Sequence, residues 1–293
     1  MKNLASPRVV RELLAEYGLR PKKRLSQHFL VDANILRRIA NAAEVGPGDH
    51  VLEIGTGLGT LTRELAKKGA AVVSVEVDRS FQPLIEKVVT GLDSVEVVFA
   101  DFLKLDLEDF LGDRWSGKWV LVGNLPYSIT SPLITKTVSA KHLFSKIVVT
   151  VQKEVAQRLS AEPGSDQYGA LTVFVQYYCE VEQLAVIPPS AFFPVPEVES
   201  ALVRLKPRER PAVDVSDEQL FFAVVRSAFG KRRKTLLNAL SSSPVLRWNR
   251  DQTYRILSRT GIDPSRRGET LSLGEFARLA DAAAVLEKSA NES

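Results

Sequence analysis

The sequence predicts an α/β protein with one large sheet and a smaller helical region towards the C-terminus. Short apolar runs alternate with helical stretches from residue 50 to about residue 151, and a glycine-rich turn follows the first run. After about residue 210 the pattern has only helical periodicity. Strands and helices that alternate at this spacing form parallel sheets through right-handed crossovers. A chain of 293 residues can bury one large core and a second, small one.

Composition narrows the class of protein. The chain is 45% hydrophobic and 25% charged, without an apolar run of about 18 residues or an apolar stretch at the N-terminus, so we expect a cytoplasmic protein without a membrane span. The single cysteine, Cys179, excludes an internal disulfide, and three widely separated histidines give no metal-ligand spacing. Residues 204–293 carry 17 Lys and Arg against 11 Asp and Glu, so the positive charge is concentrated in the C-terminal part.

The first 49 residues predict two helices separated by the basic segment Pro21–Arg24, with Asp32 as the N-cap of a helix over 33–43. Five strands should follow, at His50–Ile54, Val72–Val77, Val95–Phe99, Trp119–Val122 and Ile147–Val151. Because helical stretches separate them, we expect these strands to be parallel, with helices on both faces of the sheet.

Two more strand candidates follow a helix over Ala170–Tyr178, at Glu180–Ile187 and Glu199–Leu205. A rigid aromatic-proline segment separates them, so we interpret them as an antiparallel pair that closes a mixed, seven-stranded sheet. A proline-rich linker then leads to helices whose apolar stripe comprises Phe221, Val224, Val225 and Phe229. We therefore expect three parts: an N-terminal helical segment covering a cofactor site (1–49), a cofactor-binding domain (50–206) and a small all-α domain (207–293).

A glycine turn follows the first strand, in the sequence Glu53-Ile-Gly55-Thr-Gly57-Leu-Gly59. Glycines let a ligand approach the backbone closely, and Glu76 lies about 20 residues further on, where an acid reaches a ribose hydroxyl pair. The glycine spacing differs from that of dinucleotide-binding turns, and Glu53 suits a cation better than a pyrophosphate. These features favour S-adenosylmethionine, whose adenine amino group Asp101 could bind after the third strand. Each residue could also serve a purely structural role, as a turn, a strand end or a helix cap.

The tetrapeptide Asn124-Leu-Pro-Tyr127 ends a buried strand, where ligands of open α/β sheets lie. Pro126 favours an extended Leu125 and should leave the Leu125 carbonyl free, so this carbonyl and the Asn124 amide oxygen form two acceptors. Together they could hold both N–H groups of an aromatic amine while Tyr127 stacks on the ring. Such a nitrogen would act as a nucleophile; taken alone, the tetrapeptide could equally be a turn.

Taken together, these motifs resemble those of the ribosomal RNA adenine N6-dimethyltransferases, in particular the small-subunit type. The resemblance covers roughly residues 20–280 and rests on the segment from Lys22 to Asp32, the glycine turn, Glu76, Asp101, the tetrapeptide, Phe192–Ser200 and Phe229–Asn238. It implies a Rossmann-like methyltransferase fold and dimethylation of adenosines in small-subunit (16S) rRNA of the immature 30S subunit. Separately, we expect the protein to be a monomer. Ser26 departs from the glycine that the family commonly has at this position.

The resemblance also implies residue roles. S-adenosylmethionine would be bound by Gln27, His28, Leu30, Gly55, Gly57, Glu76, Asp101 and Asn124. Asn124 and the Leu125 carbonyl would hold the amino group of the target adenine, and Tyr127 and Phe192 would sandwich its ring. RNA phosphates would contact a basic set that comprises Arg204, Arg208, Arg210, Lys231, Arg232, Arg233, Lys234, Arg266 and Arg267.

Three alternatives remain open at the level of sequence. The chain could be a large-subunit (23S) rRNA adenine methyltransferase of the macrolide-resistance type, which shares the methyl-transfer core. It could be a non-catalytic RNA-binding assembly or transcription factor with the same fold, although the intact Asn124, Tyr127, Glu76 and Asp101 argue against this. A nicotinamide-dependent dehydrogenase is the third alternative.

Overall fold

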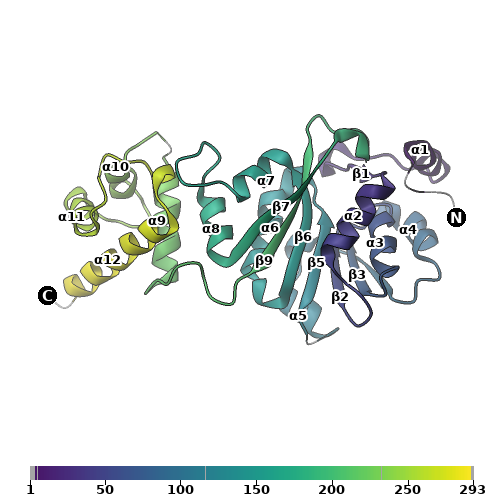
Figure 1. The fold of residues 1–293 in the computed structure, drawn as a ribbon, viewed down its shortest axis with the longest axis horizontal. Helices are drawn as coiled ribbons and strands as arrows, with labels where there is room; N and C mark the ends of the chain where they lie inside the picture. Colours follow the sequence, from purple (N-terminus) through teal and green to yellow (C-terminus); the bar gives the residue numbers. More distant parts are fainter. Residues whose placement is uncertain (1–3, 5, 116, 232, 292–293) are drawn as a thin grey trace. The chain divides into compact units, whose positions relative to one another are not determined.

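The computed structural model describes residues 4, 6–115, 117–231 and 233–291 (Figure 1). The chain divides into two compact units, one drawn from residues 1–156 and 180–207 and the other from residues 157–179 and 208–293. The second unit therefore includes residues 157–179, which precede the domain boundary expected at residue 207. Our assignment of separate roles to the three predicted parts stays a prediction.

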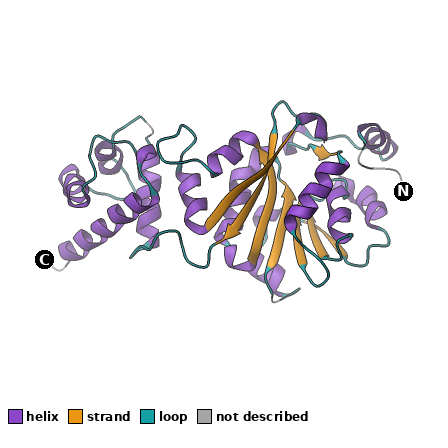
Figure 2. Ribbon diagram, in the orientation of Figure 1, coloured by secondary structure: helices purple, strands orange, loops and turns teal. Residues whose placement is uncertain are grey.

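A seven-stranded sheet forms the centre of the first unit, in the order β4-β3-β2-β5-β6-β9-β7. Its strands are β2 (His50–Ile54), β3 (Ala71–Glu76), β4 (Val95–Phe99), β5 (Trp119–Asn124), β6 (Phe144–Gln152), β7 (Cys179–Ile187) and β9 (Ser200–Pro207). Strands β2 to β6 pair in parallel, and β9 runs antiparallel to β6. The mixed α/β sheet with helices on both faces is thus confirmed (Figure 2).

The register of the central strands brings their carboxyl ends to one level. Ile54, the last residue of β2, lies opposite Val75 of β3 on one side and Gly123 of β5 on the other. The next residues along these three strands are Gly55, Glu76 and Asn124. Residues that are up to 69 positions apart in sequence therefore meet at one edge of the sheet because apolar, buried strands carry them there.

The helices of the first unit precede the sheet or follow its strands. They are α1 (Pro7–Glu16), α2 (Ala33–Ala43), α3 (Thr60–Ala66), α4 (Gln82–Val89), α5 (Leu107–Gly112), α6 (Thr130–Ser139) and α7 (Lys153–Leu159), the last of which crosses the boundary between the units. Asp32 caps α2 as predicted, because its carboxylate accepts from the backbone N–H groups of Asn34 at 2.8 Å and Ile35 at 3.1 Å. A cap of this kind stabilises a helix by about 1 kcal/mol.

Two short strands were not predicted. Strand β1 (Phe29–Leu30) pairs antiparallel with β8 (Phe192–Phe193), and the N–H of Val31 extends the ladder to the Ala191 carbonyl at 2.8 Å. Two-residue strands carry no periodicity that a sequence could reveal. Their pairing joins the N-terminal segment to the aromatic-proline segment, more than 160 positions away.

The second unit is helical, with α8 (Ala170–Tyr178), α9 (Glu218–Phe229), α10 (Leu236–Ser241), α11 (Arg250–Thr260) and α12 (Leu273–Asn291). The predicted stripe on α9 faces the core of this unit: Phe221, Val224 and Val225 are at most 1% exposed. Within the described part of the chain, no helix is both long and apolar enough to cross a membrane.

Candidate active site

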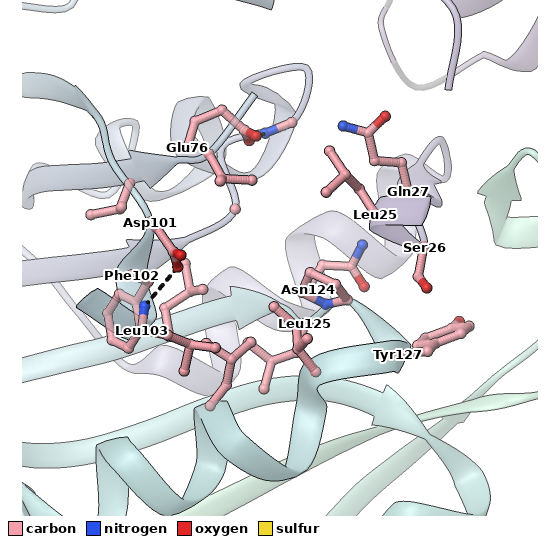
Figure 3. A pocket seen from close by; sticks show the side chains of 18 of the residues that line it. Leu25, Ser26, Gln27, Glu76, Asp101, Phe102, Leu103, Asn124, Leu125 and Tyr127 are labelled. Atoms are coloured by element: carbon pink, nitrogen blue, oxygen red, sulfur yellow. Dashed lines mark hydrogen bonds between the residues drawn. The ribbon is translucent and has the colours of Figure 1, made fainter. Parts of the chain in front are cut away.

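A cavity of about 260 Å³ opens at the carboxyl ends of β2, β3 and β5. Its lining combines the glycine turn after β2, the end of β3, the segment after β4 and the tetrapeptide after β5, together with residues 25–29 from the N-terminal segment. Figure 3 shows Glu76 and Asp101 on one side and Leu25, Ser26 and Gln27 on the other. Seven of the eight residues predicted to bind the cofactor line this cavity: Gln27, His28, Gly55, Gly57, Glu76, Asp101 and Asn124. Leu125 and Tyr127 line it as well.

The glycine turn requires glycine at two of its positions. Gly55 and Gly57 have φ of +83° and +55°, in the left-handed region that L side chains rarely adopt. A Cβ on Gly57 would also lie only 3.2 Å from the ring of Phe29, which lines the cavity from β1. The turn therefore lets both a ligand and the N-terminal segment approach the backbone.

Glu76 is 5% exposed, and both oxygens of its carboxylate accept backbone hydrogen bonds. One accepts from Gly57 N at 2.8 Å, and the other accepts from Asp78 N at 2.8 Å. Burial raises the pKa of Glu76, although these hydrogen bonds oppose the shift. Because each carboxylate oxygen has two lone pairs, Glu76 can shape the turn and still accept hydrogen bonds from a ligand.

Asp101 both caps a turn and lines the cavity. Its Oδ1 accepts from Leu103 N at 3.0 Å, drawn as a dashed line in Figure 3, and so starts the 3₁₀ turn Phe102–Lys104. The side chain of Asp101 stays 39% exposed, and its Oδ2 forms only a long ion pair of 4.0 Å with the exposed Lys104, so this oxygen can still accept a hydrogen bond from a ligand. The cap and the ligand site are therefore compatible in one residue.

The tetrapeptide after β5 presents unfilled acceptors. Asn124 Nδ2 donates to the His28 carbonyl at 2.8 Å, which fixes the amide orientation and leaves the buried Oδ1 without a hydrogen-bond partner in the described chain. The Leu125 N–H donates to the Thr150 carbonyl at 3.0 Å, and among the described residues no donor reaches the Leu125 carbonyl. A buried acceptor without a partner costs free energy, so this pair of oxygens is suited to a ligand that brings N–H groups.

The ring of Tyr127 is held from two sides. Its hydroxyl lies 2.6 Å from Oγ of the buried Ser200, and its ring stacks on His28 with centroids 5.3 Å apart and planes 22° apart. His28 Nδ1 lies 2.7 Å from the Pro194 carbonyl oxygen, so this nitrogen carries the proton and donates. The tyrosine therefore has a fixed orientation at the cavity.

Phe192 lies elsewhere than expected. Its side chain is 1% exposed and packs in a hydrophobic cluster with Leu30, Ala191 and Leu202, so it does not line the cavity beside Tyr127. Pairing with β1 accounts for this position, because it places Phe192 opposite the buried Leu30. The role of Phe192 as a second ring around the target base stays a prediction. Leu30 itself lines a smaller neighbouring cavity beneath the glycine turn.

Comparisons with known proteins agree with this geometry. The family model described as ribosomal RNA adenine dimethylase matches residues 18–283. The chain is 47% identical to a ribosomal RNA small subunit methyltransferase A from Pelotomaculum thermopropionicum, over 95% of this chain and 96% of that protein. It is 43% identical to the protein of the same name from Geobacillus kaustophilus, over 97% and 98%. The chain belongs to the ribosomal RNA adenine dimethylase family.

Two solved structures are similar as well. A dimethyladenosine transferase from Plasmodium falciparum has a TM-score of 0.73 and 28% identity, with 90% of this chain and 98% of that chain covered. The 23S rRNA methyltransferase ErmE has a TM-score of 0.65 and 27% identity, with coverage of 87% and 99%. As a member of this family, the protein is a methyltransferase that uses S-adenosylmethionine.

The cavity fits this methyl donor. It joins glycines that permit close approach, a buried carboxylate at Glu76, a half-exposed carboxylate at Asp101 and apolar walls that include Phe102 and Leu103. Such a lining suits a ligand with a ribose, a heterocycle and positive charge. The described residues contain no group of three or more His, Cys, Asp and Glu that could hold a metal ion.

A buried network beneath the glycine turn was not foreseen from the sequence, although Glu53 was noted there. Glu53 is fully buried and accepts from the hydroxyls of Thr62 at 2.5 Å and Ser74 at 2.6 Å, while Ser74 Oγ lies 2.6 Å from Thr56 Oγ1. The other oxygen of Glu53 has no partner in the described chain. Burial raises the pKa of Glu53 to about 7, opposed by the two hydroxyls. Single polar residues inside otherwise apolar strands, Glu53 in β2 and Ser74 in β3, are the signal that could have revealed it.

The basic set is heterogeneous. Arg204 forms ion pairs with Glu44 at 3.0 Å and Glu182 at 2.6 Å, and Arg266 pairs with Glu275 at 2.5 Å. Hydrogen bonds from Arg266 lower the pKa of Glu275 to about 2. The side chains of Lys231, Arg233 and Lys234 are exposed, and Arg232 lies outside the described residues. Arg204 and Arg266 thus have structural partners, which the sequence could not show.

Proposed function

We propose that the protein transfers methyl groups from S-adenosylmethionine to N6 of two adjacent adenosines near the 3′ end of 16S rRNA. The product is N6,N6-dimethyladenosine, formed during ribosome biogenesis. The relatives at 43–47% identity carry the name of a small-subunit methyltransferase, which supports the choice of RNA. We further propose that the enzyme acts in the cytoplasm as a monomer on the immature 30S subunit.

The observation that carries this proposal is the unfilled, buried Oδ1 of Asn124 beside the Leu125 carbonyl. An exocyclic amine has two N–H donors, and two acceptors at one strand end match them. As positive charge develops on the nitrogen, both hydrogen bonds become stronger, so they stabilise the transition state more than the ground state. Tyr127 supplies a ring on which the flipped base stacks.

The chemistry requires little else from the protein. S-adenosylmethionine supplies a methyl group that its sulfonium already activates. Glu76, Asp101 and the glycine turn bind and orient the donor, and Asn124 and Leu125 orient the acceptor nitrogen for in-line transfer. The fixed Tyr127 ring keeps the base plane in place. The proton released from N6 passes to solvent, because adenine N6 loses it readily once methylated.

A 23S rRNA specificity is the second candidate, supported by the similarity to ErmE. Its 27% identity compares with 47% for a small-subunit relative, which favours the 16S substrate. Both candidates use the same acceptor pair, so the cavity does not distinguish them. The choice between them concerns the RNA.

The test is incubation of unmodified 30S and 50S subunits with methyl-labelled S-adenosylmethionine, followed by nucleoside analysis. We expect label in 30S RNA as N6,N6-dimethyladenosine on two neighbouring residues. Label confined to 50S RNA would favour the second candidate. Label in neither RNA, or only in monomethylated adenosine, would refute the proposal.

A further inference from the structure

The segment Lys22–Val31, termed the strap, crosses one side of the cofactor cavity. It contains the 3₁₀ turn Lys23–Leu25, then Ser26 with φ of +47°, and then β1. Residues 25–29 line the cavity. Ser26 thus adopts the left-handed conformation that glycine favours. Because the strap makes few regular backbone hydrogen bonds, side chains must hold it in place.

Asp78 is the anchor of the strap on the sheet. It lies two residues after β3, and its side chain is 4% exposed. Its Oδ1 accepts from Lys22 Nζ at 2.7 Å, and its Oδ2 accepts from Gln27 Nε2 at 3.2 Å. Gln27 Oε1 in turn accepts from the Lys22 backbone N–H at 2.8 Å, which closes the loop between the two strap residues. Burial raises the pKa of Asp78, but donors led by Lys22 outweigh it and hold the pKa below its usual value.

The anchor is tied directly to the residue expected to bind the cofactor ribose. Glu76 accepts from the backbone N–H of Asp78 with one oxygen and from that of Gly57 with the other, both at 2.8 Å. The position of Asp78 therefore depends on the carboxylate of Glu76. A ligand that rearranges hydrogen bonds at Glu76 also acts on the anchor.

The other end of the strap is tied to the acceptor site. The His28 carbonyl accepts from Asn124 Nδ2 at 2.8 Å, and the His28 ring stacks on Tyr127. These contacts set which atom of the Asn124 amide faces the cavity. One continuous series of contacts thus runs from Glu76 through Asp78, Gln27 and His28 to the acceptor side chains.

We propose that Asp78 is a positioning residue that fastens the strap over the cofactor, and thereby couples donor binding to the setting of Asn124 and Tyr127. The inference rests on the proposed function for the identity of the acceptor site. Asp78 does not line the cavity, so it acts through Gln27 and His28 rather than by touching the donor. A purely stabilising role is the competing explanation, because Asp78 Oδ1 also accepts from Ser80 N at 3.2 Å and Ser80 Oγ at 2.6 Å and so caps the 3₁₀ turn Arg79–Phe81.

Opening of the strap can be measured by limited proteolysis. Lys22, Lys23 and Arg24 are trypsin sites, so the rate of cleavage there measures how often the strap opens. The wild-type protein, Asp78→Asn, Asp78→Glu and the control Glu96→Gln would be digested with and without S-adenosylhomocysteine. Glu96→Gln removes an exposed ion pair, with Arg114 at 2.7 Å, from β4 of the same sheet. Thermal melting and steady-state kinetics would be measured on the same samples.

We expect S-adenosylhomocysteine to slow cleavage of the wild-type strap and of Glu96→Gln. In Asp78→Asn, cleavage should be about tenfold faster, as for loss of a charge-assisted hydrogen bond, and protection by the ligand should largely disappear. Its kcat on 30S subunits should fall while the KM for the donor rises, and Asp78→Glu should restore part of both. Wild-type cleavage and protection in Asp78→Asn would overturn the proposal, as would a lowered melting temperature with protection intact.

Lys22→Met is the second variant, in case Asp78→Asn does not fold. It keeps the buried carboxylate and the cleavage sites after Lys23 and Arg24, and the same loss of protection is expected; unchanged protection would refute the anchor. The trypsin experiment needs no RNA. If Asp78→Asn loses protection as expected but the wild-type enzyme forms no dimethyladenosine, the proposed function is refuted and the positioning role of Asp78 is supported. If Asp78→Asn methylates 30S subunits at the normal rate, the positioning role of Asp78 is refuted and the proposed function is supported.

Discussion

The cofactor cavity and the basic set differ in how the fold treats residues that the sequence singled out. In the cavity, Glu76, Asp101 and Asn124 come from three different strand ends and meet around one space. In the basic set, Arg204 and Arg266 are engaged by acidic neighbours, while Lys231 and Lys234 remain exposed. Strand order fixes the position of a residue that follows a buried strand. Whether a surface Lys or Arg is available to bind phosphate depends on which acidic side chains lie beside it.

The largest effect should come from Asn124→Ala, because it removes the unfilled Oδ1 acceptor together with the Nδ2 hydrogen bond to the His28 carbonyl. We expect kcat to fall roughly 100- to 1,000-fold, as for loss of one group that stabilises charge in a transition state. Binding of S-adenosylhomocysteine should change far less. Single-turnover methylation of 30S subunits measures the first quantity and calorimetry the second.

Asn41→Ala is the matched control, since it removes an exposed amide that accepts from Lys68 in the same unit. It should leave the rate unchanged. Full-speed methylation by Asn124→Ala would show that Asn124 does not hold the target amine.

Glu53→Gln tests whether the Glu53 carboxylate beneath the glycine turn is buried in solution. The pKa of Glu53 is about 7 in the folded chain, against 4.5 for an ordinary glutamate, so folding takes up a proton between these values. The unfolded state then binds fewer protons, and the free energy of unfolding falls as pH rises through this window. The stabilising contribution is complete below pH 4.5 and is lost above pH 7, a change of about 3 kcal/mol.

The variant does not titrate at this position, so its stability relative to the wild type should improve by that amount between pH 4.5 and pH 8. Urea unfolding at a series of pH values measures the difference. A difference that stays constant with pH would show that Glu53 is solvated in solution.

Whether a structural feature could be predicted from the sequence depends on how far apart in the sequence its interacting residues lie. The seven strands of the large sheet, the Asp32 cap and the α9 stripe depend on local patterns, and all of them were predicted. The β1–β8 pairing and the position of Phe192 depend on contacts between segments more than 160 positions apart, which no local pattern contains. Ser26 is intermediate, because the family comparison identified the position but not its left-handed backbone.

Within the site, Glu76, Asp101 and Asn124 could be predicted because each lies at or just after the end of a strand, whereas Gln27 and His28 were expected only from the family resemblance. The residues that hold them could not. Asp78, Ser200 and the Glu53 partners act through side-chain hydrogen bonds across the fold, and their sequence neighbours carry no sign of it. Polar residues inside apolar strands are the one indication available.

Substitutions of Tyr127 test whether its ring stacks on the target base. Tyr127→Ala should raise the KM for RNA about 5- to 150-fold, which corresponds to the 1–3 kcal/mol that stacking on one base contributes. Tyr127→Phe keeps the ring and loses only the hydrogen bond to Ser200, so its effect should be smaller. Steady-state kinetics with 30S subunits measures both.

Phe192→Leu is the informative partner of these variants. The ring is buried in the core of the first unit, so the substitution should lower the melting temperature while the KM for RNA changes little. If Phe192→Leu instead raises this KM as much as Tyr127→Ala does, then the ring moves into the cavity when RNA binds. That result would restore the sandwich expected from the sequence.

The smallest effects per residue should come from the basic set, where the comparison can be made within one group of cations. Each phosphate contact that is lost should reduce the slope of log affinity against log salt by about 0.7 to 0.9. We expect this reduction for Lys231→Ala and Lys234→Ala, whose side chains are exposed. Arg266→Ala should leave the slope unchanged and lower stability, because Arg266 holds Glu275 and the Thr270 carbonyl within the second unit. RNA binding measured at several salt concentrations separates the two classes, and equal slopes for all three variants would mean that the ion pair of Arg266 opens when RNA binds.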